Sequence, residues 1–369
     1  MREVKVLIAA GGSGGHIFPA ISLGRALKSR RKDVELLFVG SDKALDKRIF
    51  EKEGAAFSLL SANKLPYTAS LALVPFFMRL CLDTVKSFAI MLSYKPDVIV
   101  GFGGYISFPA ILAGRMLRVP AIVHEQNVVP GRANRILFRL ADRIALSFED
   151  TRAWLGRDAP KAVMTGNPIR TEMFRDDRSW GIRKFGFDAN KFTVLVIGGS
   201  QGSHALNRTF IDALFTLADT PRRSLQVIHI TGARDYEWAA SAYEETGIEY
   251  RVHSFVDRIE EAYSASDLVV TRSGASALFE LAFLGKPMIL VPYPFAMSHQ
   301  KENAAAFSKN GAAFEIDEKD LSADRFRDTL VDFLNNRQKL KSLGAAARRM
   351  AVPGASEILA REVAELAGS

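Results

Sequence analysis

A glycine-rich loop that follows a short apolar strand occurs twice in this chain, and it constrains the fold more than any other feature. Residues 4–10 lead into Gly11-Gly12-Ser13-Gly14-Gly15, and residues 192–197 lead into Gly198-Gly199-Ser200-Gln201-Gly202. A helical segment follows each loop. Strand, glycine loop and helix in this order are typical of α/β folds with parallel sheets. The repetition therefore predicts two similar α/β domains.

Other short apolar segments extend this pattern on both sides of residue 165. They are residues 34–40, 97–102, 121–124 and 143–147 in the first half, and 225–230, 250–255, 268–271 and 288–291 in the second. The predicted fold class is α/β, with two Rossmann-like domains and parallel sheets. We expect an N-terminal domain at 1–164, a polar linker at 165–188 and a C-terminal domain at 189–350. Because open parallel sheets bind ligands at their carboxyl ends, the active site is expected in the cleft between the domains.

Charge is distributed unevenly along the 369 residues. The net charge is +8, yet residues 1–160 carry 23 basic and 14 acidic side chains, whereas residues 161–369 carry 26 and 27. The first half should therefore face something anionic, such as a phosphate-bearing substrate, a membrane surface or a nucleic acid. Because the chain lacks an RNA-binding signature and a run of five basic residues, nucleic acid is the least favoured partner.

The single cysteine and the N-terminus indicate where the chain resides. Cys81 has no second cysteine to pair with, which fits a reducing compartment. The apolar run before the first glycine loop is too short for the hydrophobic region of a signal peptide. A cytoplasmic location is expected.

The glycine loops match few nucleotide-binding or catalytic signatures. Ile17 stands where G-x-G-x-x-G needs its third glycine, and no Walker A sequence is present. Both loops satisfy G-x-S-x-G, at Ser13 and Ser200, so a serine hydrolase is one alternative. Phosphate binding by backbone N–H groups is the more general interpretation of such loops. No D-x-D or H-E-x-x-H motif occurs, and one cysteine cannot build a zinc cluster, so we expect no metal and no cofactor.

The stretch from Ser266 to Gln300 suggests a nucleotide-sugar pocket. An apolar strand at 267–271 is followed by the small-residue turn 273–276, where a ligand could approach the amides of a helix N-terminus. Glu280 follows on that helix, where a carboxylate can accept hydrogen bonds from two sugar hydroxyls. An ordinary βαβ unit with a solvated glutamate is the alternative.

Six motifs occur in an order that resembles the MurG family of GT-B glycosyltransferases. They are GGSGGH at 11–16, GFGGYISFPA at 101–110, HEQNVVPGRANR at 124–135, TGNPIR at 165–170, GGSQG at 198–202, and RSGASALFE at 272–280 with HQ at 299–300. The resemblance implies inverting transfer of GlcNAc from UDP-GlcNAc to undecaprenyl-pyrophosphoryl-MurNAc-pentapeptide (lipid I), giving lipid II. It also implies that a C-terminal helix at 351–369 packs back on the first domain. A related GT-B enzyme acting on diacylglycerol and a non-catalytic nucleotide-sugar-binding protein are alternatives.

The resemblance also assigns the UDP-GlcNAc contacts. Asn127 would lie beside the sugar, Arg170 and Ser200 near the phosphates, the Val256 backbone at the uracil, Glu280 at the ribose and Gln300 at the diphosphate or sugar. The full set of implied donor contacts is Ser13, Gly14, Gly15, Asn127, Arg170, Ser200, Val256, Ala275, Ser276, Ala277, Leu278, Phe279, Glu280 and Gln300. The chain departs from some relatives at His299, where they carry a second glutamine, so no sugar contact is assigned to His299.

The implied reaction needs a base that removes a proton from the acceptor hydroxyl. His16 is the first candidate, because a helix N-terminus disfavours the imidazolium ion and keeps the ring neutral. The alternative role for His16 is to cap the loop. Glu125 is the second candidate for the base, and His124 is expected to be structural.

The segment from Leu71 to Leu92 is apolar apart from one stripe of charge. Arg79, Asp83 and Lys86 would form this stripe, and three charges with Pro75 argue against a transmembrane helix. A core-packed helix is one interpretation. The other is an interfacial patch that binds anionic lipid on the cytoplasmic face of the bacterial inner membrane. Its members would be Val74, Phe76, Phe77, Arg79, Leu80, Lys86 and Phe88, with Lys64, Lys95, Arg115 and Arg118 around it.

Overall fold

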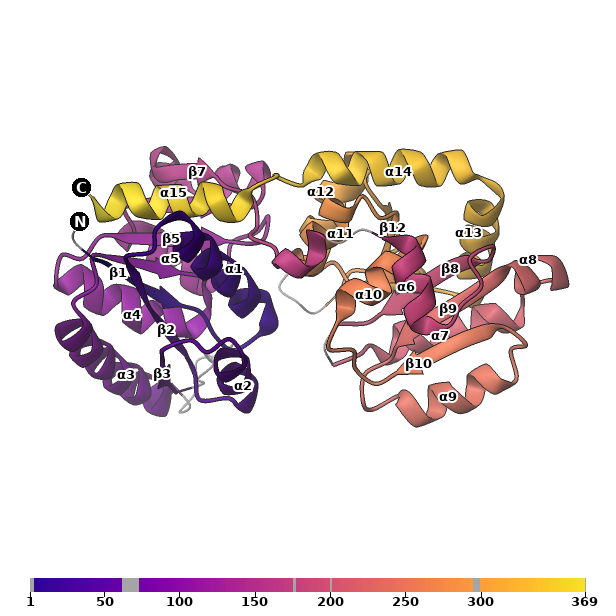
Figure 1. Ribbon diagram of the computed structural model, residues 1–369, viewed down its shortest axis with the longest axis horizontal. Coiled ribbons are helices and arrows are strands. Elements are labelled where there is room, and N and C mark those ends of the chain that lie inside the picture. Colours follow the sequence, from indigo (N-terminus) through magenta and orange to yellow (C-terminus); the bar gives the residue numbers. More distant parts are fainter. Residues whose placement is uncertain (1–2, 62–72, 175–176, 200, 295–298, 369) are drawn as a thin grey trace. The chain divides into compact units, whose positions relative to one another are not determined.

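The computed structural model describes residues 3–61, 73–174, 177–199, 201–294 and 299–368, and the chain forms two compact units (Figure 1). Unit 1 comprises Met1–Arg170 and Val352–Ser369, and unit 2 comprises Thr171–Ala351. Each unit is an α/β/α sandwich around one parallel sheet. The predicted fold class, two Rossmann-like domains with parallel sheets, is confirmed.

The sheet of unit 1 has seven parallel strands in the order β3-β2-β1-β4-β5-β6-β7. Their bounds are β1 Val4–Ala9, β2 Val34–Ser41, β3 Phe57–Leu60, β4 Val98–Gly101, β5 Ala121–Glu125, β6 Arg143–Leu146 and β7 Ala162–Met164. Side chains of β1 alternate between the two faces, with Val6 and Ile8 in one core and Leu7 and Ala9 in the other. Both faces are therefore buried, which explains why the strands are continuous apolar runs.

Helices cover both faces of this sheet. Helices α1, α2 and α15 contribute to the core that contains Val6, and helices α3, α4 and α5 to the core that contains Leu7. Their bounds are α1 Gly14–Arg30, α2 Ala44–Lys52, α3 Leu73–Tyr94, α4 Gly104–Met116, α5 Arg132–Leu140 and α15 Ala355–Ala367, with 3-10 helices at Glu149–Trp154 and Gly156–Lys161. The C-terminal helix thus belongs to the first unit, where Leu359 and Val363 are buried.

The sheet of unit 2 has six parallel strands in the order β10-β9-β8-β11-β12-β13. The strands are β8 Phe192–Ile197, β9 Leu225–Ile230, β10 Glu249–His253, β11 Leu268–Thr271, β12 Met288–Leu290 and β13 Phe314–Glu315. The helices are α6 Arg178–Phe185, α7 His204–Phe215, α8 Asp219–Ser224, α9 Tyr236–Glu244, α10 Ile259–Ala265, α11 Ala275–Leu284, α12 His299–Lys309, α13 Ala323–Asn335 and α14 Arg337–Met350, with 3-10 helices at Thr171–Phe174 and Glu318–Asp320. Helices α7, α9 and α13 share one core with β8 and β9.

The structure adds elements that the sequence pattern did not predict. Three short strands, β3, β7 and β13, lie at the edges of the two sheets. Helix α6 lies within the predicted linker 165–188 and packs against α10 of unit 2. Asp177 begins α6 by accepting a hydrogen bond from the Trp180 amide, and Gly186 ends it with a φ of 62°. Of the helices that the structure describes, none is both long and apolar enough to cross a membrane.

Candidate active site

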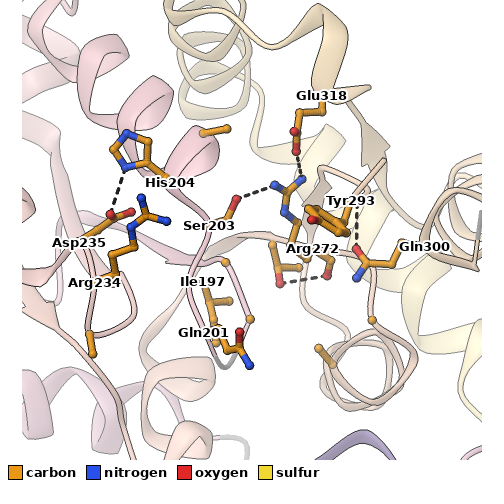
Figure 2. A pocket seen from close by; sticks show the side chains of 18 residues that line it. Ile197, Gln201, Ser203, His204, Arg234, Asp235, Arg272, Tyr293, Gln300 and Glu318 are labelled. Atoms are coloured by element: carbon orange, nitrogen blue, oxygen red, sulfur yellow. Dashed lines mark hydrogen bonds and ion pairs between the residues drawn. The ribbon is translucent and has the colours of Figure 1, made fainter. Parts of the chain in front are cut away.

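A cavity of about 1000 Å³ opens at the carboxyl ends of the strands of unit 2 (Figure 2). The loops after β8, β9, β11, β12 and β13 form its walls. Its lining residues are Ile197, Gly198, Gly199, Gln201, Gly202, Ser203, His204, Ala205, Ala233, Arg234, Asp235, Thr271, Arg272, Gly274, Ala277, Tyr293, Gln300 and Glu318. This is where an open parallel sheet binds its ligand.

The glycine loop after β8 is locked against the loop after β9. Gly202 has a φ of 77°, and a Cβ atom there would lie 2.0 Å from the Thr231 carbonyl oxygen. Gly232 has a φ of 83°, and its Cβ atom would lie 2.6 Å from the Gln201 carbonyl oxygen. Only glycine fits both the left-handed backbone and this close approach. The two glycines therefore fix the wall of the cavity.

Helix α11 presents an open N-terminus to the same cavity. Its first residue follows Gly274, which provides no side-chain cap, and a Cβ atom on Gly274 would meet none of the described residues within 4 Å. Ala277 in the first turn lines the cavity. Uncapped amides at a helix N-terminus attract anions, so this turn is suited to a phosphate group.

Hydrogen bonds tie the start of α12 to the turn before α11. The Ser273 hydroxyl donates to the Gln300 carbonyl oxygen at 2.7 Å, and the Asn303 side-chain amide donates to the Ser273 carbonyl oxygen at 3.2 Å. The Gln300 Oε1 atom accepts from the Tyr293 amide at 3.0 Å (Figure 2). These contacts hold the Gln300 side chain at the cavity wall.

The structure brings only part of the predicted donor set to this cavity. Ala277 and Gln300 line it, whereas Ala275, Leu278, Phe279 and Glu280 are buried on α11 and Ser276 is half-buried. Val256 is half-buried in the loop between β10 and α10, and it is not among the lining residues. Ser200 lies outside the described residues.

The four side chains that form two pairs at the cavity wall were not predicted from the sequence. Arg272 and Glu318 form an ion pair at 2.5 Å, and His204 Nδ1 lies 3.0 Å from Asp235 Oδ1. Arg272 stands inside the RSGASALFE motif, directly after a strand. This position could have identified Arg272 as a site residue from the sequence. The partners in each pair are far apart in the sequence, so their pairing depends on the tertiary structure.

A chain of hydrogen bonds runs from the cavity into the core of unit 2. Asp235 also accepts from the Asn207 side-chain amide at 2.8 Å, and Asn207 Oδ1 lies 3.1 Å from His229 Nε2. The Tyr243 hydroxyl lies 2.9 Å from His229 Nδ1. Burial lowers the pKa of His229 to about 3, so the ring is neutral and each nitrogen has one role. This network fixes the side of the cavity that His204 lines.

The first glycine loop, in unit 1, is organised by a buried carboxylate. Asp46 is fully buried, and its Oδ2 atom accepts from the amides of Gly12 at 2.8 Å and Ser41 at 2.9 Å and from the Ser41 hydroxyl at 2.6 Å. A Cβ atom on Gly11 would lie 2.7 Å from this oxygen. Asp46 thereby sets the conformation of the loop that carries Ser13, Gly14, Gly15 and His16.

His16 lies in the first turn of α1, with a half-buried side chain. Its Nδ1 atom is 3.3 Å from the Gly11 carbonyl oxygen, and a Cβ atom on Gly104 would come within 3.3 Å of the ring. Burial lowers the pKa of His16, and the charges of Glu125 and Asp46 oppose this shift only partly. The ring is therefore neutral at pH 7, as predicted, but burial is the largest cause of the lowered pKa. Ser13 and Gly15, beside it, are exposed.

Glu125 holds the loop after β5 together. Its Oε1 atom accepts from the Asn127 backbone amide at 2.9 Å and side-chain amide at 3.1 Å, and its Oε2 atom accepts from the Gly131 amide at 3.1 Å and the Asn134 side chain at 2.7 Å. The carboxylate is buried. Because both oxygens are engaged in positioning the HEQN loop, the geometry favours a structural role for Glu125 over that of a base.

His124 and Arg170, from two of the family motifs, have different surroundings. The His124 Nε2 atom lies 3.0 Å from the Gly166 carbonyl oxygen, and the Gln126 side-chain amide is 3.0 Å from Nδ1. Burial lowers the pKa of His124 to about 4, so this ring is a neutral structural group. Arg170 stacks over the Phe18 ring at 4.6 Å, at the beginning of α1.

In helix α3 the three charged residues of the predicted stripe do not share one environment. Asp83 is buried rather than solvated, since it accepts hydrogen bonds from the Tyr105 hydroxyl at 2.8 Å and the Ser61 amide at 3.2 Å. Phe76 is buried, and Leu80 and Phe88 are half-buried. The opposite, solvent-facing side is apolar and includes Val74, Phe77, Met78, Leu82, Val85 and Leu92, each at least 54% exposed. Arg79 and Lys86 are exposed, as predicted.

The part of the chain that the structure describes contains no cluster of three His, Cys, Asp or Glu side chains arranged to hold a metal ion. In the cavity Arg272 forms an ion pair with Glu318, and Asp235 lies 3.0 Å from His204 Nδ1, while Arg234 also lines the wall. Groups that can bind an anion at this cavity include backbone amides, hydroxyls and the Arg234 side chain.

Comparison with known proteins places these features in a family. Residues 6–146 match the glycosyltransferase family 28 N-terminal domain, and residues 193–359 match the glycosyltransferase family 28 C-terminal domain. The chain is 37% identical to the UDP-N-acetylglucosamine--N-acetylmuramyl-(pentapeptide) pyrophosphoryl-undecaprenol N-acetylglucosamine transferase of Geobacter sulfurreducens, over 98% of each chain. It is 34% identical to the enzyme of the same name from Halalkalibacterium halodurans, over 99% of this chain and all of the relative.

The chain belongs to the MurG family of glycosyltransferases. Among solved structures, Acinetobacter baumannii MurG superimposes with a TM-score of 0.76 at 26% identity, covering 98% of this chain and 99% of that one. The predicted family is confirmed. Each of the two matched domains carries one of the two glycine loops.

Proposed function

We propose that this protein transfers N-acetylglucosamine from UDP-GlcNAc to the C4 hydroxyl of MurNAc in lipid I, giving lipid II for peptidoglycan synthesis. The observation that carries the proposal is the near full-length identity to relatives that are named as this transferase. The cavity of unit 2, with its glycine loop and the open N-terminus of α11, supports it because these groups suit a nucleotide diphosphate.

The donor contacts follow from the family motifs and from the cavity. Gln300 and the first turn of α11 would meet the diphosphate and sugar, as their positions at the cavity wall suggest. Glu280 would bind the ribose hydroxyls and the Val256 backbone the uracil, and the donor would then extend beyond the cavity toward these two residues. Asn127 and Arg170 keep their predicted roles at the sugar and the diphosphate.

The proposed chemistry is a single displacement with inversion. The C4 hydroxyl oxygen of the acceptor attacks the anomeric carbon, the bond from that carbon to the diphosphate oxygen breaks, and UDP leaves with the bonding electrons. His16, whose pKa is lowered by partial burial so that the ring is neutral, takes the hydroxyl proton. Helix N-termini, hydroxyls and an arginine stabilise the departing diphosphate, so the reaction needs no metal ion.

The proposed acceptor carries a polyprenyl chain, which places the enzyme at a membrane surface. The apolar outer side of α3 would lie on the cytoplasmic face of the bacterial inner membrane, with Arg79 and Lys86 beside it. An exposed apolar patch next to basic side chains is typical of interfacial binding to anionic lipid. No observation favours the diacylglycerol transferase, the hydrolase or the binding protein that the sequence left open.

The test is transfer of radiolabel from UDP-[¹⁴C]GlcNAc to a short-chain lipid I analogue in the presence of EDTA. We expect label in a product that co-migrates with lipid II. Label in diacylglycerol but not in the lipid I analogue would contradict the proposed acceptor, and loss of transfer in EDTA would contradict the metal-independent mechanism. A Ser13→Ala variant that keeps its transfer activity would exclude Ser13 as a nucleophile.

A further inference from the structure

Ser203 lies at a fixed point of the cavity wall, between the glycine loop after β8 and the start of α7 (Figure 2). A Cβ atom on Gly198 would lie 2.5 Å from the Ser203 amide nitrogen, and Gly202 is locked against Thr231. The backbone on the N-terminal side of Ser203 therefore has little freedom. No donor contact was assigned to this residue by the family motifs.

The Ser203 hydroxyl does not cap the N-terminus of helix α7. It is the N-cap residue of α7, where a serine commonly accepts a hydrogen bond from an amide in the first turn, yet it makes no such bond. Its Oγ atom instead accepts a hydrogen bond from Arg272 Nη2 at 2.5 Å. The hydroxyl is thus oriented by a cation, and the amides of the first turn are left without a side-chain cap.

Arg272 is held rigidly by the ends of the neighbouring strands. Nη1 donates to the carbonyl oxygens of Val291 at 3.0 Å and Pro292 at 3.2 Å, directly after β12, and lies 2.5 Å from Glu318 after β13. Ser203 follows β8 and Arg272 follows β11, so one guanidinium joins the ends of four adjacent strands. The side chain is only 7% exposed, and Glu318 compensates its buried charge.

These contacts determine what Ser203 can bind. A hydroxyl has one hydrogen to donate, and an oxygen that already accepts from a guanidinium becomes a stronger donor. The partner that fits such a donor, beside the uncapped amides of α7, is an anionic oxygen. Because Arg272 is neutralised by Glu318, the arginine orients the hydroxyl and does not itself act as the counter-ion of a ligand.

We propose that the Ser203 hydroxyl binds the diphosphate of the nucleotide sugar, and that Arg272 and Glu318 are the positioning residues that aim it. The proposal rests on the proposed function, because it takes the anion to be the diphosphate of UDP-GlcNAc. It adds a phosphate contact that the family motifs do not supply, three residues beyond Ser200.

Calorimetric titration with UDP and with uridine separates this role from a structural one. In Ser203→Ala we expect the dissociation constant of UDP to rise by about tenfold or more, since a hydrogen bond to a charged group is lost. The affinity for uridine should stay within twofold, because uridine has no phosphate. Ser203→Thr, which keeps a hydroxyl, should restore most of the UDP affinity, and Ser224→Ala on α8 is the matched control outside the cavity.

The positioning role is tested by Glu318→Gln alone and combined with Ser203→Ala. Glu318→Gln should weaken UDP binding less than Ser203→Ala does, and the double variant should bind UDP no more weakly than Ser203→Ala, because both changes act on one hydroxyl. In steady-state assays both variants should raise the KM for UDP-GlcNAc and leave the KM for the lipid acceptor unchanged.

Three results would overturn the inference. Ser203→Ala could weaken the binding of UDP and uridine equally, or it could leave the UDP affinity unchanged. It could also raise only the KM of the lipid acceptor, which would mean that Ser203 binds the acceptor's pyrophosphate instead. If Ser203→Ala melts at a much lower temperature than wild type, Glu318→Gln and Ser203→Thr still decide the question. Failure of the wild type to bind UDP at all would count against the proposed function, independently of Ser203.

Discussion

At the scale of single residues, two side chains proposed for proton transfer have different surroundings. Glu125 is buried and accepts four hydrogen bonds from the loop that it organises. His16 has one contact through Nδ1, with the Gly11 carbonyl oxygen. A general base must reach the proton that it removes, and a carboxylate whose oxygens are saturated must first give up bonds. His16 is therefore the better candidate for the base.

His16→Gln should lower kcat by about 10²- to 10⁴-fold while UDP-GlcNAc still binds, because glutamine fills the site without accepting the proton. In the wild type only the neutral ring acts as a base, so kcat falls as the pH drops through the pKa of His16. Burial lowers this pKa, so the acid limb of the kcat profile should lie below the ordinary histidine value of 6.5. A limb above 6.5, or a His16→Gln variant with near-normal kcat, would contradict this role.

Sequence motifs point to individual site residues, but they do not reveal which side chains contact one another in the folded chain. His16 and Gln300 were proposed from the sequence because each stands in a short, specific motif. Arg272 stands in one too, but its partners Ser203 and Glu318 come from other loops, and only the strand order brings them together. A buried charge needs a compensating partner, yet the sequence does not say which acidic residue supplies it.

At the scale of elements, helix α3 shows how far an amphipathic pattern can be interpreted. Periodicity separates a charged face from an apolar face, and it normally places the apolar face in the core. Here Asp83 is buried because Tyr105 and Ser61 supply hydrogen bonds, and several large apolar side chains remain outside. Those donors come from other elements, so the sequence of the helix alone could not decide which face is buried.

Replacing Leu82 and Val85 together by aspartate should release the protein from vesicles that contain anionic lipid. Each side chain is more than two-thirds exposed, and burying each in the interface contributes about 1.5–3 kcal/mol, so the partition coefficient should fall by at least about 100-fold. Co-sedimentation measures the bound fraction, and Leu45→Asp on α2 is the control for an exposed leucine elsewhere in unit 1. Unchanged sedimentation would show that α3 does not contact the membrane. Transfer to a soluble acceptor analogue should persist in the double aspartate variant and in Leu45→Asp, because neither change lies in the proposed site.

Most strands were predictable because parallel strands buried on both faces leave continuous apolar runs. The three that were missed, β3, β7 and β13, have four, three and two residues. They are edge strands, and segments this short leave too few residues for a periodic pattern. Helix α6 was missed for another reason, since it is short, polar and lies in a stretch whose composition resembles a linker.

At the scale of the whole molecule, the chain leaves unit 1 after Arg170 and returns to it at Val352. The return is specified by close packing, because Gly166 has a φ of 75° and a Cβ atom there would lie 2.5 Å from the Cβ of Val352. Arg143 then pairs with Glu362 and Glu365 of α15. The last eighteen residues are therefore part of the first folding unit, although the sequence separates them from it by unit 2.

Leu359→Ala should for this reason destabilise unit 1 although the mutation lies near the C-terminus. Leu359 is completely buried in the core with Ile8, Ile17 and Phe38, so its truncation should cost about 2–5 kcal/mol. Hydrogen exchange at the amides of β1 and β8 reports on each unit separately. We expect faster exchange in β1 with β8 nearly unchanged, and the reverse for Leu330→Ala, the matched leucine in the core of unit 2. Truncating a buried side chain of a helix should destabilise the strands of the core into which that helix packs. Faster exchange in β8 for Leu359→Ala would therefore mean that α15 stabilises the second unit instead.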